Sequence, residues 1–146
     1  MVYVLPPQSA VGLGDFAVAA AAPDVKRSVV LIFSEDPLAA ALIGAAVELA
    51  GLEPAFPAVR EAPRDALLRV RPGLVLADAD HDGACAPDFL GPALMTGARV
   101  LLLESAHTRR DTAAVTTRFG VRSISLPAGA DAIARLVNSE LEAGAR

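Results

Sequence analysis

The chain has 146 residues, a length that fits one folded domain. Its composition, 53% hydrophobic and 21% charged, excludes a disordered protein, and its single cysteine, Cys85, excludes an internal disulfide and a disulfide-rich secreted scaffold. A net charge of −4 argues against direct binding to nucleic acid, because phosphate backbones attract basic surfaces.

No apolar run reaches the roughly 18 residues that a membrane-spanning helix needs, since Pro, Gly or a charge interrupts each one. We therefore expect no membrane contact and a cytoplasmic location. Residues 16–23 end in AVAAAAP, which looks like a signal cleavage site, but no Lys or Arg precedes them. Residues 1–27 show no period of 2 or 3.6 and are predicted to be an arm or linker before a domain at 28–146.

From residue 28 onward, short apolar runs alternate with helix-like segments. A first strand is expected at 29–33, and the helix that follows, at 38–50, has Pro37 in its first turn and Gly51 behind it. Further strands are expected at 55–59, 74–77, 100–103 and 121–126. Further helices are expected at 63–70, 88–96, 108–119 and 131–141.

Strict alternation of five strands and five helices predicts an α/β fold. Nearly continuous apolar strands are typical of parallel sheets covered on both faces. We expect a flavodoxin-like (βα)5 doubly wound sheet with strand order 2-1-3-4-5, whose site lies at the carboxyl ends of the central strands. The segments to inspect are then 34–36, 78–82 and 104–107.

Carboxylates collect at two of these strand ends: Glu35 and Asp36 follow the first strand, and Asp78, Asp80 and Asp82 follow the third. Acids that close together raise one another's pKa unless a cation sits among them. Mg²⁺ would suit, because it needs one or two carboxylates plus waters. Solvated loop acids are the alternative.

Four segments together resemble the receiver domain of two-component response regulators over residues 28–141. They are VLIFSEDP at 30–37, RPGLVLAD at 71–78, VLLLESA at 100–106 and FGVRSISLP at 119–127. The resemblance implies that Asp78 stands at the phospho-acceptor position and Ser105 at the switch hydroxyl. It also implies a weak Mg²⁺ site at Glu35, Asp78 and Asp80.

The chain departs from the receiver pattern at the positions that handle phosphate. Leu126 stands where the resemblance expects a lysine that holds the phosphoryl group, and Lys26, the only lysine in the chain, precedes the first strand. Ser34 replaces the first carboxylate of the acidic pair, and Ser123 replaces an aromatic residue on the fifth strand. These losses weaken phosphorylation chemistry and leave the fold intact.

The resemblance also implies a surface for partners on the last two helices and the strand between them. The arginines expected there are Arg109, Arg110, Arg118, Arg122 and Arg135. Candidate partners are a histidine kinase, another signalling domain or a second copy of the chain. A solvated helix surface is the alternative.

Other single-residue signals are weaker. DADHDG at 78–83 matches the start of a calcium loop, but Phe89 stands where that loop needs a bidentate glutamate. His81 and His107 fall at the edge of the expected site without a nucleophile at a suitable spacing, and we expect both to be exposed bystanders. Cys85 has no cationic neighbour in sequence, so we expect an inert thiol.

Three functions remain open. The first is an atypical receiver-like domain, or pseudo-receiver, of a phosphorelay that acts mainly through protein contacts and is not an enzyme. The second is a working receiver phosphorylated on Asp78 by a histidine kinase. The third is a small-molecule-binding flavodoxin-like domain, which the missing glycine-rich phosphate loop argues against. VYVLPP at 2–7 briefly resembles the closing strand of a histidine-kinase ATPase domain, which would make the chain part of a hybrid kinase.

Overall fold

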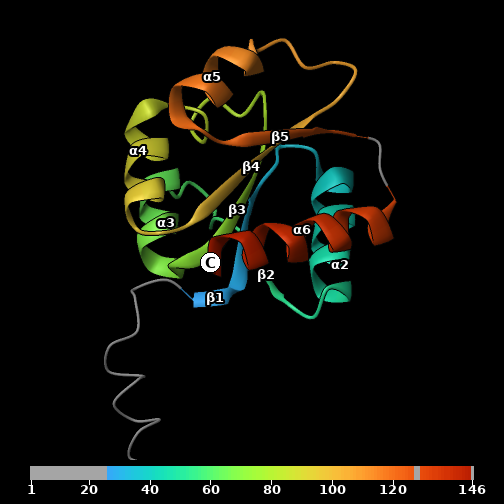
Figure 1. Cartoon of the computed structure of the whole chain (residues 1–146). Coiled ribbons are helices and arrows are strands. Elements are labelled where there is room, and N and C mark those ends of the chain that lie inside the picture. Colours follow the sequence, from blue (N-terminus) through green and yellow to red (C-terminus); the bar gives the residue numbers. More distant parts are fainter. Residues whose placement is uncertain (1–25, 127–128, 146) are drawn as a thin grey trace, which may run out of the picture.

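The computed structural model describes residues 26–126 and 129–145. The order of elements is β1 (Lys26–Phe33), α2 (Pro37–Leu49), β2 (Glu53–Ala55), α3 (Pro63–Val70), β3 (Pro72–Asp78), α4 (Pro87–Met95), β4 (Arg99–Glu104), α5 (Thr112–Phe119), β5 (Arg122–Ser125) and α6 (Ala130–Ala145) (Figure 1). The strands form one parallel sheet in the order β2-β1-β3-β4-β5. The predicted flavodoxin-like fold and its strand order are confirmed.

The sheet is buried on both faces, as its apolar strands require. Along β1, Val29, Leu31 and Phe33 face one core, which α3, α4 and α5 cover, while Val30 and Ile32 face a second core beneath α2 and α6 (Figure 1). None of the helices in the described ranges is long and apolar enough to cross a membrane.

Helix α2 begins and ends where its capping residues allow. The Asp36 carboxylate accepts the backbone N–H of Leu38 at 3.0 Å, and Pro37 occupies the first turn, where a missing N–H costs nothing. Gly51 follows the helix with φ +83°, a conformation that glycine adopts without strain. This start places Asp36 at the carboxyl end of β1.

Two elements differ from the sequence prediction. Strand β2 spans Glu53–Ala55 instead of 55–59, so it ends before Pro57. Helix α5 begins at Thr112 instead of 108, because the carboxylate of Asp111 accepts the N–H of Ala114 and caps the helix there. Residues 105–111 form a loop instead of the first turn of the helix.

The first strand includes two residues that were assigned to the predicted arm. β1 includes Lys26, which pairs with Pro72 of β3. Residues 1–25, which carry the rest of the predicted arm, lie outside the described residues.

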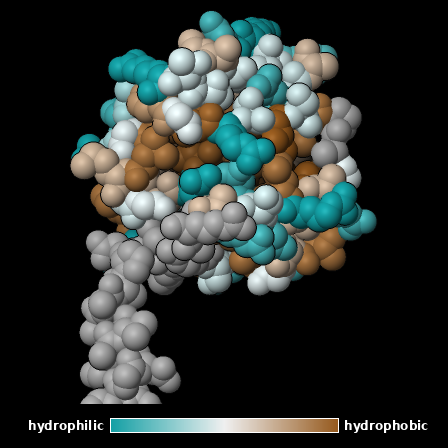
Figure 2. Space-filling model, viewed as in Figure 1, coloured by the Kyte–Doolittle hydropathy of each residue, from teal (hydrophilic) through white to brown (hydrophobic). Residues whose placement is uncertain are grey.

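Large apolar side chains also reach the surface. On the face seen in Figure 2, apolar and hydrophilic side chains lie side by side. Helix α2 contributes Leu38, Leu42 and Leu49, with Leu38 82% exposed. An outer face with so few charges is unusual for a surface helix, which normally carries polar residues opposite its buried stripe.

Candidate functional site

A small cavity lies at the carboxyl edge of the sheet, between the ends of β1, β3 and β4. Its volume is about 90 Å³. Its lining residues are Ser34, Asp36, Ala39, Ile43, Asp78, Leu103, Ser105 and Leu126. The structure therefore brings the predicted phospho-acceptor position and the predicted switch residue into one cavity.

Asp78 is the last residue of β3 and lies opposite Leu103 of β4. Its side chain is partly buried, and Oδ1 accepts the backbone N–H of Asp80 at 3.0 Å. This contact turns the chain away from the strand directly behind Asp78. One oxygen of the Asp78 carboxylate is thus hydrogen-bonded to the backbone two residues later.

The acidic residues that follow β1 do not complete a metal site. Glu35 is exposed and is not among the residues lining the cavity, while Asp36 lines it but uses its carboxylate to cap α2. No group of three or more His, Cys, Asp or Glu side chains in residues 26–126 and 129–145 is placed to hold a metal ion. Of the predicted set of Glu35, Asp78 and Asp80, only Asp78 lines this cavity.

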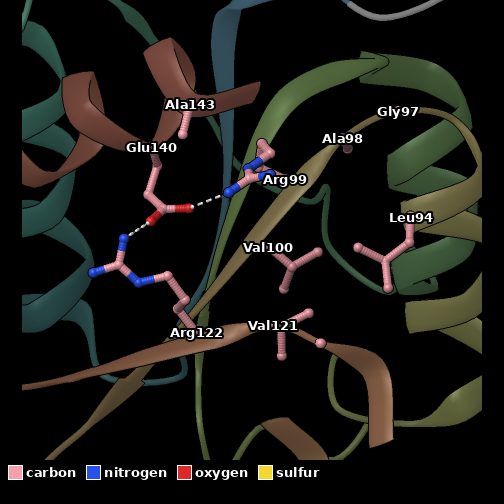
Figure 3. A pocket seen from close by; sticks show the side chains of 10 residues that line it. Leu94, Gly97, Ala98, Arg99, Val100, Val121, Arg122, Glu140 and Ala143 are labelled. Atoms are coloured by element: carbon pink, nitrogen blue, oxygen red, sulfur yellow. Dashed lines mark hydrogen bonds and ion pairs between the residues drawn. The ribbon is translucent and has the colours of Figure 1, made fainter. Parts of the chain in front are cut away.

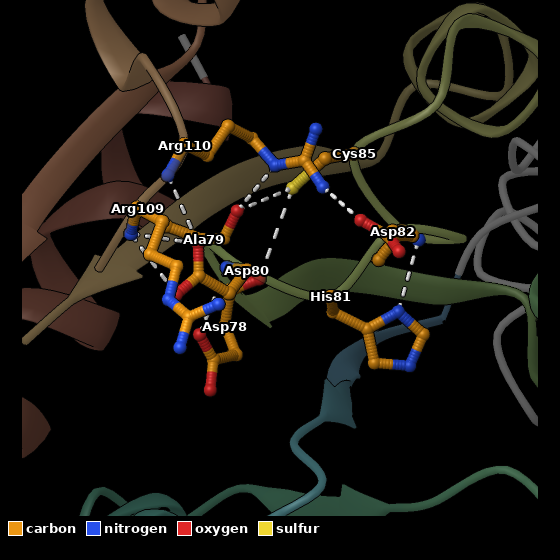
Figure 4. A network of polar contacts seen from close by, with 9 residues as sticks. Asp78, Ala79, Asp80, His81, Asp82, Cys85, Arg109 and Arg110 are labelled. Carbon is orange, nitrogen blue, oxygen red and sulfur yellow. Dashed lines mark hydrogen bonds and ion pairs between the residues drawn. The ribbon is translucent and has the colours of Figure 1, made fainter. Parts of the chain in front are cut away.

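Asp80 is drawn to the loop that follows β4 instead. Its carboxylate accepts the backbone N–H of Arg109, at 3.1 Å to each oxygen, and the N–H of Arg110 at 3.0 Å (Figure 4). Two consecutive amides on one carboxylate form charge-assisted hydrogen bonds, which are stronger than neutral ones. Asp80 therefore links the two loops.

The side chain of Arg110 reaches from the loop after β4 back to the loop after β3. Its Nε donates to the carbonyl of Ala79 at 2.6 Å, and its guanidinium pairs with the carboxylate of Asp82 (Figure 4). The guanidinium thus has two acceptors within the domain.

Ser105 sits in a tight turn after β4. Its hydroxyl oxygen accepts the N–H of His107 at 3.2 Å, and its own N–H donates to the Thr108 hydroxyl at 2.8 Å. The backbone N–H of Thr108 closes the turn on the Ser105 carbonyl at 3.1 Å. The hydroxyl that resembles a switch is therefore bonded within its own turn.

Leu126 supplies the wall of the cavity where the resemblance expects a cation. Its side chain lines the cavity and packs against the core under α2 and α6. Its backbone N–H donates to the carbonyl of Glu104, which holds the chain at the end of β5 against β4. Asp78 thus faces an apolar wall and not an ammonium group.

His81 and Cys85 have structural contacts. The Nδ1 of His81 accepts the N–H of Ala84 at 3.1 Å, and its ring meets Phe33 edge-on with centroids 5.4 Å apart, so it is half-buried and not the exposed bystander expected. Burial raises the pKa of the Cys85 thiol above its ordinary value, and the positive charge of Arg110 partly opposes this rise. His107 is exposed, beside a shallow hollow lined also by Asp80, Asp82, Arg109 and Arg110.

The arginines of the predicted partner face lie on several elements. Arg109 and Arg118 are exposed, the latter lying over the ring of Phe119 at 5.1 Å, whereas Arg122 starts β5 at the opposite, amino edge of the sheet. Arg135 is on α6, which covers the other face of the sheet. Arg118, Arg122 and Arg135 thus lie on α5, on the edge strand β5 and on α6, the two helices and the strand on which the partner face was predicted.

Sequence reasoning missed the most buried charged group of the described chain. Glu140 on α6 is 1% exposed and accepts from Arg99 at 3.3 Å and from Arg122, at the edge of a cavity of about 280 Å³ (Figure 3). Its spacing from Ile133 and Val137 puts it on the buried stripe of the helix, and this was the signal available in the sequence.

Comparison with known proteins gives the fold a context. No family model matches the chain, and no curated protein matches it. Among solved structures it is similar to NtrX from Brucella abortus, with a TM-score of 0.67 and 17% identity over 82% of this chain. The match spans only 27% of the NtrX chain.

Two further structures match over nearly their whole length. The signal receiver domain of a LuxO repressor protein from Vibrio parahaemolyticus has a TM-score of 0.62 and 22% identity, covering 82% of this chain and 94% of that one. A CheY-like response regulator receiver domain from Methanospirillum hungatei has a TM-score of 0.63 and 16% identity, covering 82% and 98%. The fold of the chain is that of receiver domains.

Proposed function

We propose that this chain is an atypical receiver-like signalling domain of a two-component phosphorelay. It acts mainly through contacts with a protein partner, is not an enzyme, and is phosphorylated on Asp78 poorly or never. The observation that carries the proposal is the composition of the cavity at Asp78. Leu126 lines it where a cation would be needed, and neither Glu35 nor Asp80 lines it beside Asp78.

Negative charge in the cavity disfavours phosphorylation of Asp78. A phosphoryl group on Asp78 would bring about two negative charges into a cavity that Asp36 also lines. In the neighbouring loop, the guanidinium of Arg110 is already bonded to Asp82 and to the Ala79 carbonyl. The phosphorylated form therefore lacks the contacts that would make it favourable.

A working phospho-acceptor is the second candidate. The arrangement of Asp78 and Ser105 in one cavity favours it, because these are the two residues that the resemblance assigns to phosphate acceptance and to its detection. Under this alternative, a histidine kinase would phosphorylate Asp78.

The candidate partners are a histidine kinase, another signalling domain and a second copy of the chain. One similar structure is described as a dimer of the beryllofluoride-activated NtrC4 receiver domain, with 15% identity and a TM-score of 0.63, over 80% of this chain. Exposed Arg109 and Arg118 remain available for such contacts.

The experiment that separates the two candidates is incubation of the full chain with Mg²⁺ and acetyl phosphate, followed by intact mass measurement. We expect at most a trace of phosphoryl adduct on the wild-type chain and none on Asp78→Ala. A stoichiometric adduct that Asp78→Ala abolishes would establish the phospho-acceptor and overturn the proposal.

A further inference from the structure

The loops that follow β3 and β4 are bonded to each other at the carboxyl edge of the sheet. Residues 79–86 form the first loop and residues 105–111 the second. The contacts between them come from Asp80 in one direction and from Arg110 in the other (Figure 4).

Asp80 is well placed to hold the second loop. Its own N–H is bonded to the Asp78 carboxylate at 3.0 Å, so its backbone is fixed before its side chain reaches across. The carboxylate then accepts the N–H groups of Arg109 and Arg110, residues 29 and 30 positions later in the chain. Neither amide lies in a helix or strand, so without Asp80 both would have to find water.

The side chain of Arg110 also bonds across to the first loop. Its Nε bonds the carbonyl of Ala79, a residue with no exposed surface, and its guanidinium reaches Asp82. The first loop thus supplies every acceptor of these contacts and the second loop every donor, while one side chain reaches across from each loop. We call Asp80 and Arg110 together the loop clasp.

We propose that the loop clasp fixes the position of residues 105–111, including the closed turn at Ser105, independently of the charge on Asp78. A carboxylate built into the chain then does for this loop what an added anion would otherwise have to do. A ligand shifts a protein between two states only by its differential affinity for them, and the clasp favours one state in advance. The regulatory meaning rests on the proposed function, whereas the clasp itself does not.

The test is backbone amide hydrogen exchange, measured by NMR on the full chain, at Arg109 and Arg110. In the wild type we expect both amides to be protected. In Asp80→Ala we expect their exchange to be roughly 10- to 100-fold faster, the change that loss of a hydrogen bond to a charged group implies. Asp80→Asn, which keeps one acceptor oxygen, should lie between the two.

Two internal controls keep the result interpretable. Amides of β3 and β4, such as those of Leu76 and Leu102, should exchange as in the wild type, which shows that the variant is folded. Asp88→Ala removes an exposed acid of α4 and should leave Arg109 and Arg110 unchanged. Wild-type exchange rates at both amides in a folded Asp80→Ala would overturn the clasp.

Failure of the clasp and failure of the proposed function are separate outcomes. Fast exchange at Arg109 and Arg110 in the wild-type chain, with no adduct from acetyl phosphate, would overturn the clasp alone. Protected amides in a chain that is stoichiometrically phosphorylated on Asp78 would support the clasp and overturn the proposed function. The clasp would also fail if phosphorylation itself released the two amides.

Discussion

The carboxylate of Glu140, near the end of α6, is held by the guanidinium of Arg122 at the start of β5. Arg99, at the start of β4, holds the other oxygen (Figure 3). A carboxylate that is only 1% exposed would be costly without such partners, because burial disfavours its charged form. The contact ties the last helix to the amino edge of the sheet, opposite the candidate site.

Replacing Arg122 with Ala should therefore destabilise the domain. The substitution leaves one oxygen of the buried Glu140 carboxylate unpaired. We expect the free energy of unfolding to fall by about 1 to 2 kcal/mol. This value is at the low end for a hydrogen bond between charged groups, because Arg122 is more than half exposed. Urea unfolding measures the change. Arg135→Ala, which removes an exposed arginine of α6, is the matched control, and an equal effect of the two would contradict the prediction.

Leu126→Lys should make Asp78 easier to phosphorylate. The new ammonium would enter the wall of the cavity that Asp78 lines, and one charge-assisted hydrogen bond of about 1.5 to 3 kcal/mol corresponds to roughly 10- to 100-fold more adduct. Intact mass after incubation with acetyl phosphate and Mg²⁺ measures it. Leu126→Met is the control for size, and equal labelling of both variants would show that the missing cation is not what limits the reaction.

Arg71→Gly should stabilise the domain. Arg71 follows α3 with φ +52°, a left-handed conformation that costs a residue with a side chain about 1 kcal/mol and costs glycine little. We expect a net gain of about 0.5 to 1 kcal/mol in the free energy of unfolding. The gain does not exceed the cost of the left-handed conformation, because glycine also increases the conformational entropy of the unfolded chain, which favours unfolding. Arg64→Gly, inside the same helix, should instead lose about 1 kcal/mol, and a loss at both positions would refute the argument.

Glu61 should titrate far below an ordinary glutamate. Its carboxylate accepts two hydrogen bonds from Arg69, at 2.8 and 2.7 Å, and one from the N–H of Ala58 at 2.8 Å, which lower its pKa from 4.5 to about 2. Because the folded pKa is the lower one, this contribution to stability is present above pH 4.5 and is lost as the pH falls toward 2.

An NMR titration of the Glu61 carboxyl carbon measures this pKa directly. Arg69→Gln should move the midpoint back toward 4.5, because the hydrogen bonds from Arg69 are the largest cause of the shift. A wild-type midpoint near 4.5 would mean that the ion pair does not persist in solution.

Most of the fold could be predicted from the sequence, because each strand is a short apolar run and each helix is bounded by residues such as Pro37 and Gly51. The exact position of β2 could not. Three residues are too few for a pattern, and Pro57 made the later segment look like the edge strand. The start of α5 depends on Asp111 as a cap and on contacts from Asp80, a residue on a different loop.

The sequence could predict those site residues whose positions follow from the carboxyl ends of the strands. Asp78 and Ser105 end neighbouring strands and therefore share a cavity, while Glu35 has no such constraint and is exposed. The partners of Arg110 and Glu140 lie 18 to 41 positions away in sequence, so no local pattern could assign them. The only sequence signal for Glu140 was an acidic residue at a position of the apolar stripe of its helix.

The two outer strands limit how the domain can associate with other proteins. β2 has three residues, one of which is Pro54 and has no N–H to offer, and β5 has four. Strands this short are poor templates for an added strand from another chain, which is how many proteins avoid uncontrolled sheet growth. Recognition of this domain by another protein is therefore expected to depend on side chains of its helices and loops, and not on main-chain pairing along the sheet.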